Sequence, residues 1–279
     1  MVGLLAAPGS TITSGISNVT WSGCIEERDT IETITGLTPI NSLPSGALDL
    51  DIDLPATDID SRWKPAWIEL IYSRNTLADS TSGSKESTSG CPTDQARRLM
   101  NYASISSSPT ERPSLSSFSS YINGLSLGGG TMHDIGFTWG SRFISGNGIF
   151  AADNPSIWNG QPVGRHIIFM TDGEMNAHTD QYVFHGYNEL DQRVAPRGTS
   201  DTTINAIHTR RMRIACEQAK ARNITVWVIA FASGSASSYP DLQACATTNN
   251  HFKFAADAAT LNAEFQNIAT SIARLRLSQ

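Results

Sequence analysis

The second half of the chain alternates short apolar runs with polar stretches of helical length. Residues 166–170 and 224–231 are continuous apolar runs, and residues 251–255 form a third, weaker one. Runs of this length, bounded by turn residues, are typical of buried strands. Strands that alternate with helices predict an α/β fold with a mostly parallel sheet and helices on both faces.

Two helices are predicted between and after these strands. Residues 201–222 read as one helix, which Asp201, Thr202 or Thr203 can cap at its start and Asn223 can close. The last segment carries an apolar stripe at alternating intervals of four and three residues, which indicates an amphipathic helix. The residues of this stripe are Leu261, Phe265, Ile268, Ile272 and Leu275.

The first half has a different character. Residues 10–120 are rich in Ser, Thr, Gly and Pro, with a strand-like run at residues 66–72. The alternating acidic run Asp49-Leu-Asp51-Ile-Asp53 is interpreted as a solvated edge strand, since it lacks the glycine that a calcium loop needs. Regular structure is therefore expected mainly after residue 120.

Composition narrows the classes of function. The 279 residues include 39% hydrophobic and 16% charged residues, and the formal net charge is −6. This balance argues against a disordered charged tail and against nucleic-acid binding. No stretch reaches the roughly 20 apolar residues of a membrane helix. The apolar residues 1–8 lack the basic start of a signal peptide.

Four cysteines allow two disulfides in three pairings if the protein is exported, or four isolated buried thiols otherwise. Cys216 lies on a predicted helix and Cys245 follows the next strand, so these two are expected to be neighbours. Cys24 and Cys91 would then form the second link. None of the spacings is C-x-x-C, which argues against zinc-ribbon and thioredoxin chemistry.

Two segments carry candidate chemistry. Gly128-Gly129-Gly130 permits a tight turn before Thr131, and Asp172 follows a predicted buried strand. A threonine hydroxyl and a carboxylate, completed by water, suit Mg²⁺, which prefers oxygen ligands. Taken singly, Thr131 is better explained as a helix N-cap and Asp172 as an Asx-turn residue. Together, at one edge of a sheet, they predict a cation site.

These segments resemble the von Willebrand factor type A domain, in which a Gly-Gly-Thr loop and a strand ending in Thr-Asp-Gly form a metal-ion-dependent adhesion site. Residues 21–28, 131–140 and 165–174 are in addition similar to the C-terminal part of TadG-like proteins, which serve tight-adherence (Flp, Tad) pilus assembly in Gram-negative bacteria. The resemblance spans nearly the whole chain.

The resemblance implies a von Willebrand A-type, Rossmann-like sheet that begins within residues 1–14, a long irregular insertion at 15–120, and a main core at 121–279. It implies a non-enzymatic protein on the periplasmic or extracellular side of the cell envelope that binds protein partners of the pilus machinery. Contact with the inner membrane would be made only through an N-terminal helix that is not in this chain.

The resemblance also implies the ligands. Thr131 and Asp172 would bind Mg²⁺, or alternatively Mn²⁺ or Ca²⁺, and Asp134 and Glu174 could support them through hydrogen bonds. The Asp-x-Ser-x-Ser motif of the family is missing from the sequence. The chain therefore looks like a fragment or a misplaced start, with an incomplete site that binds metal weakly or not at all.

Two alternatives stay open. One is a structural envelope protein with a vestigial metal site. The other is a serine hydrolase, because Gly124-Leu-Ser126-Leu-Gly128 matches G-x-S-x-G, and Ser126, Asp172 and His251 follow in hydrolase order. The residues before Gly124 are polar and helix-like, which disfavours a nucleophile elbow. The remaining histidines show no zinc-site spacing and are interpreted as ordinary surface or core residues; they include His166, His178, His185 and His208.

Overall fold

Three parallel strands form the central sheet of the computed structural model, in the order β11–β10–β7. They are β7 (Arg165–Thr171), β10 (Ile224–Phe231) and β11 (Phe252–Ala255). The register places Val228 opposite Phe169 on one side and Phe252 on the other. The structure describes residues 11–13, 18–20, 24–66, 121–125, 130–179 and 182–277. The three predicted strands are confirmed, with boundaries shifted by one residue at most.

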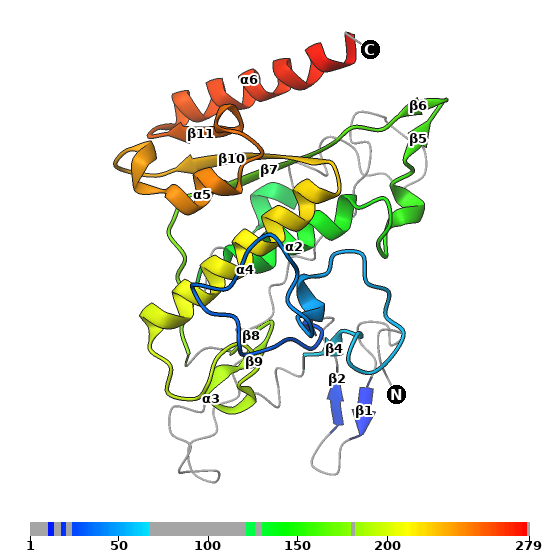
Figure 1. The fold of residues 1–279 in the computed structure, drawn as a ribbon, viewed down its shortest axis with the longest axis vertical. Helices are drawn as coiled ribbons and strands as arrows, with labels where there is room; N and C mark the ends of the chain where they lie inside the picture. Colours follow the sequence, from blue (N-terminus) through cyan, green and yellow to red (C-terminus); the bar gives the residue numbers. More distant parts are fainter. Residues whose placement is uncertain are drawn as a thin grey trace. The chain divides into compact units, whose positions relative to one another are not determined.

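Helices cover both faces of this sheet (Figure 1). On one face lie α2 (His133–Ile144), α4 (Asp201–Ala221) and α5 (Pro240–Cys245), and on the other lies α6 (Ala258–Leu277). Alternate residues of β10 face the two layers, because side chains of a strand point to opposite faces in turn. Val226 and Val228 join the core under α2 and α4, whereas Trp227 and Ile229 contact α6. The predicted α/β class with helices on both faces is confirmed at this level.

The boundaries of α4 differ slightly from the prediction. Its N-cap is Ser200, whose Oγ accepts a hydrogen bond from the backbone N–H of Thr203 at 3.3 Å. The predicted cap within residues 201–203 is therefore wrong by one residue. Asn223 adopts a φ of 57°, the left-handed conformation that commonly follows a helix end, as the sequence predicts.

The apolar stripe of α6 packs only in part. Ile268 is fully buried against Trp227 and Ile229, and Leu261 and Ile272 are partly buried in the same cluster. Phe265, in contrast, is 38% exposed. The side chain of Leu275 lies outside the described residues. The helix packs mainly against β10 and β11.

The chain divides into two compact units. Residues 28–61, 130–181 and 187–279 form the unit that holds the sheet, and residues 1–27, 62–129 and 182–186 form the other. The range expected as a single insertion, 15–120, is thus divided between the two units. The apolar core of the sheet unit includes Ile34, Leu50 and Ile52 beside Phe137 and Val226.

The smaller elements complete the description. Two-stranded sheets pair β1 with β2, β3 with β4, β5 with β6 and β8 with β9. Their bounds are β1 (Thr11–Thr13), β2 (Asn18–Thr20), β3 (Ile25–Glu26), β4 (Lys64–Pro65), β5 (Ile157–Trp158), β6 (Gln161–Pro162), β8 (Tyr182–Val183) and β9 (Gly186–Tyr187). The short helices are η1 (Leu48–Leu50), η3 (Ala151–Asp153), α3 (Asn188–Asp191), η4 (Ala236–Ser238) and η5 (Asn249–His251). The strand-like run at residues 67–72 lies outside the described residues.

A disulfide joins Cys216 on α4 to Cys245 at the end of α5, with their Cα atoms 5.3 Å apart. This is the predicted pair. Cys24 is also disulfide-bonded, while its expected partner, Cys91, lies outside the described residues. Within the ranges that the structure describes, no helix is both long enough and apolar enough to cross a lipid bilayer.

The acidic run at residues 49–53 is not a solvated edge strand. Asp49 lies in η1, is 3% exposed and pairs with Arg211 of α4. Asp51 and Asp53 both pair with Arg222 at the end of the same helix. Residues 211 and 222 are three helical turns apart and so lie on one face of α4. The acidic segment therefore docks along α4, a long-range pairing that local alternation does not reveal.

Candidate cation-binding site

A cleft of about 480 Å³ lies where β7 ends and α2 begins. Both predicted metal ligands, Thr131 and Asp172, line it. Its other lining residues are Met132, His133, Gly136, Phe169, Met170, Thr171, Phe231 and Leu261. The cleft lies at the carboxyl ends of β7 and β10, the edge at which open parallel sheets usually bind ligands.

Thr131 is held beside the end of β7 by its backbone. Its N–H donates to the carbonyl of Asn176 at 2.9 Å, and its carbonyl accepts from the Asn176 N–H at 2.8 Å. This pair forms an isolated antiparallel bridge between the loop before α2 and the loop after β7. The two loops are therefore held together by main-chain hydrogen bonds, and the Thr131 side chain takes no part in this bridge.

A second tie runs between the helix and the strand. His133, the first residue of α2, forms a hydrogen bond of 2.9 Å between its Nε2 and Thr171 Oγ1. The Thr171 hydroxyl is in turn 3.1 Å from the carbonyl oxygen of Gly173. Burial lowers the pKa of His133, and the charge of Asp134 opposes this effect. A neutral His133 thus anchors the wall of the cleft.

Asp172 supplies the negative charge at this edge. Asp172 is exposed and Thr131 is half-buried, and both residues line one solvent-accessible cleft. Mg²⁺ is commonly bound through one or two carboxylates with several retained waters. Two protein oxygens fit such a partly hydrated ion. Among the described residues, no group of three or more His, Cys, Asp or Glu side chains is placed to hold a metal.

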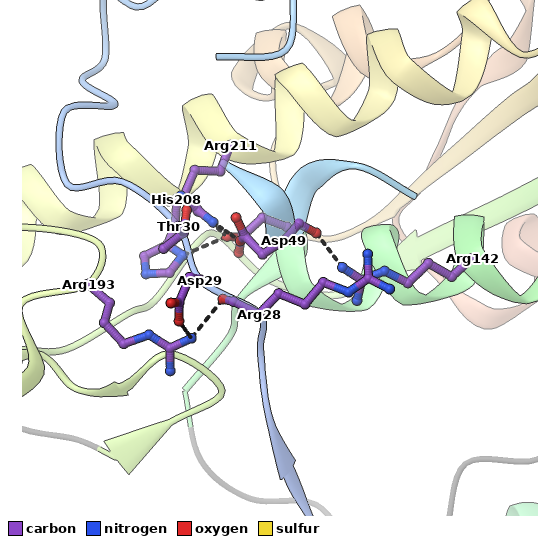
Figure 2. A network of polar contacts seen from close by, with 9 residues as sticks. Arg28, Asp29, Thr30, Asp49, Arg142, Arg193, His208 and Arg211 are labelled. Carbon is purple, nitrogen blue, oxygen red and sulfur yellow. Dashed lines mark hydrogen bonds and ion pairs between the residues drawn. The ribbon is translucent and has the colours of Figure 1, made fainter. Parts of the chain in front are cut away.

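Asp134 is not among the residues that line this cleft; it belongs to a buried polar network whose members Asp49, His208 and Arg211 are shown in Figure 2. Its Oδ2 accepts from His208 Nδ1 at 2.8 Å and from Arg211 Nε at 3.3 Å. Arg211 also bonds Asp49 and, at 3.2 Å, the hydroxyl of Thr30. The network extends through Arg142, which donates to the carbonyl of Asp49. Asp134 thus balances buried charge between two helices.

Glu174 lines a different cleft, of about 350 Å³, between the loop after β7 and helix α4. Its side chain is exposed. His133 borders both clefts, and so it forms part of the partition between them. Thr131 and Asp172 therefore line one cleft, whereas Asp134 and Glu174 do not line it.

The residues of the hydrolase alternative are not gathered in this way. Ser126 lies outside the described residues. His251 precedes β11, where its Nδ1 is 2.6 Å from Thr248 Oγ1. In the strand register, Asp172 lies two strands away from His251 and four residues further along the parallel sheet. At 3.3 Å per residue, the two residues are therefore more than about 13 Å apart.

Sequence reasoning missed part of the cleft. Phe231, the last residue of β10, and Leu261 of α6 also line the cleft and add apolar surface to it. The place of Phe231 in the cleft could have been predicted from its position at the end of a predicted parallel strand, because parallel strands end at one edge of the sheet. Leu261 carried no such signal, since its place on the amphipathic stripe predicts only burial.

Comparison of the chain with models of protein families, with curated proteins and with solved structures finds no match.

Proposed function

We propose that this chain is a von Willebrand A-type, TadG-like domain of the cell envelope, which binds a protein partner of pilus assembly or adhesion through a divalent cation. Mg²⁺ is the expected ion, and Mn²⁺ or Ca²⁺ could replace it. The proposal makes the domain a non-enzymatic binding module. The observation that carries it is that Thr131 and Asp172, which are 41 residues apart in the sequence by numbering, line one cleft at the carboxyl edge of a parallel sheet.

The proposed mechanism is non-covalent. Thr131 Oγ1 and an Asp172 oxygen would each supply one ligand, and water would fill the other positions of the ion. An acidic side chain of the partner could displace one of these waters, since hard cations favour carboxylate oxygen. The apolar walls at Phe231 and Leu261 would then contact whatever side chains flank that acidic group.

A second function is supported by the small number of ligands. Only two protein oxygens are proposed, and the Asp-x-Ser-x-Ser motif is missing from the sequence. Under this alternative the chain is a structural envelope domain, and its cation site is vestigial. Affinity for the ion separates the two functions.

The test is calorimetric titration of the chain with MgCl₂ and, separately, MnCl₂. Saturable one-to-one binding is expected, with affinity reduced at least tenfold in Asp172→Asn and in Thr131→Val. Glu174→Gln is the matched control, because Glu174 is an exposed carboxylate in the neighbouring cleft. The absence of binding by the unaltered chain would favour the vestigial site. Equal binding by Asp172→Asn would place any bound ion elsewhere.

A further inference from the structure

A separate cavity of about 290 Å³ lies at the opposite end of β7 from Asp172. Arg165, which lines it, is the first residue of β7, and Asp172 directly follows the last. The seven residue steps between them correspond to about 23 Å along a strand. The full lining is Ser145, Gly146, Asn147, Ser156, Val163, Arg165, Arg222, Asn223 and Ile224. This cavity is therefore independent of the proposed cation site.

Arg165 is held in place but is not neutralised. Its Nη2 donates to the carbonyls of Asn154 at 2.7 Å and Pro155 at 3.1 Å. A guanidinium has five N–H donors, so these two bonds leave three available. Within the described ranges, no carboxylate forms an ion pair with Arg165. A β-carbon at Gly146 would lie 2.5 Å from Nη2, so a larger residue at this position would force the guanidinium to shift.

The other arginine of the cavity is already balanced. Arg222 pairs with Asp51 at 3.2 Å and also with Asp53. Asp53 accepts a further bond from the hydroxyl of Ser145. No acidic residue is among those that line the cavity. The wall therefore carries one unbalanced positive charge, on Arg165, together with serine and asparagine side chains.

We infer that this cavity binds a small tetrahedral oxyanion, phosphate or sulfate. The Nε–H and Nη1–H groups of Arg165, which the two carbonyls leave available, can donate to such an anion, and charge-assisted bonds of this kind are the strong ones. The hydroxyl of Ser156, which is exposed and lies beside Gly146 and Arg165, can donate to a third oxygen. A volume of about 290 Å³ exceeds the roughly 30 Å³ share of one water severalfold, which leaves room for the anion with part of its hydration.

Calorimetric titration with sodium phosphate at constant ionic strength tests the inference. Saturable one-to-one binding is expected, weakened at least tenfold in Arg165→Gln and severalfold in Arg165→Lys, which keeps the charge but loses the fixed Nε and Nη1 donors. Arg197→Gln is the matched control, since Arg197 is a largely exposed arginine outside the cavity, and it is expected to bind as the unaltered chain does. No saturable binding, or equal affinity in Arg165→Gln, would overturn the inference.

Loss of Arg165 could also disturb folding, since two backbone carbonyls would lose their donor. Ser156→Glu avoids this difficulty, because Ser156 is exposed and the introduced carboxylate would form an ion pair with Arg165 in place of the anion. This variant is expected to keep the circular dichroism spectrum and to lose phosphate binding; retained binding would count against the site. Titrations with sulfate and acetate distinguish tetrahedral from planar anions, and acetate affinity equal to that of phosphate would refute the tetrahedral assignment.

Discussion

His133 Nε2 lies 2.9 Å from Thr171 Oγ1, and this hydrogen bond fastens the first residue of α2 to the last residue of β7. Thr131 precedes the histidine by two residues, and Asp172 directly follows the threonine. The bond therefore fixes the spacing between the two proposed ligands. It acts together with the backbone bridge from Thr131 to Asn176, which holds the same two loops.

Replacement of His133 by Leu is expected to lower the free energy of unfolding by about 1–3 kcal/mol, because the buried Thr171 hydroxyl loses a partner. Urea denaturation measures the loss. Thr171→Val removes the other partner, and the double variant closes a double-mutant cycle with an expected coupling of about 1 kcal/mol. Additive losses in the cycle would show that the bond contributes nothing of its own.

The same histidine predicts a pH dependence of stability in metal-free buffer. Burial lowers the pKa of His133 from its ordinary value of 6.5. Between 6.5 and that lowered pKa the unfolded chain binds a proton that the native chain does not, so unfolding becomes more favourable as the pH falls. The stabilising contribution is complete above pH 6.5 and is lost as the pH falls through the lowered pKa.

The measurement is the urea midpoint at a series of pH values for the unaltered chain and for His133→Gln. His251, whose pKa burial also lowers, is present in both and cancels in the difference. The unaltered chain is expected to lose stability below pH 6.5 more steeply than the variant. Parallel curves would mean that His133 titrates alike in the native and unfolded states.

Asp49 and Asp51 are expected to differ in their effect on stability although they are two residues apart. Asp49 pairs with Arg211 in the buried network, so Asp49→Ala leaves Arg211 to share the Asp134 carboxylate with His208 and should cost about 3 kcal/mol. Asp51 and Arg222 are both partly exposed, so Asp51→Ala should cost about 1 kcal/mol or less. Urea denaturation of the two variants provides the comparison, and similar losses would contradict the burial-based ranking.

The sheet unit illustrates what local patterns predict well. The run at 224–231 coincides with β10, because a strand buried on both faces must be apolar throughout. Thr131 and Asp172 were paired from the expectation that loops at the carboxyl edge of a parallel sheet meet, and both do line one cleft. These features depend on periodicity and strand direction, which the sequence carries locally.

The buried polar network was not predicted, because it depends on long-range pairing that the local pattern does not carry. Asp134 was expected to support the cation site, whereas its carboxylate on α2 bonds His208 and Arg211 of α4. Asp49 was expected in solvent, although it pairs with an arginine that is 162 positions away. Such pairings depend on which helix faces pack together, and alternation within a short segment does not encode that.

The disulfide between Cys216 and Cys245 is expected to stabilise the sheet unit by about 3–4 kcal/mol. It closes a loop across 29 positions, and restricting a loop of that size in the unfolded chain gives this order of effect. Both cysteines are fully buried, so the double variant Cys216→Ala with Cys245→Ala removes the link at the cost of a small cavity.

Urea denaturation without reductant should show the full loss, and dithiothreitol should lower the stability of the unaltered chain more than that of the variant. Equal sensitivity to dithiothreitol would contradict a stabilising link, because reduction would then act only elsewhere. Peptide mapping without reduction provides the covalent check, since a linked 216–245 peptide must be present before any stability difference is assigned to it.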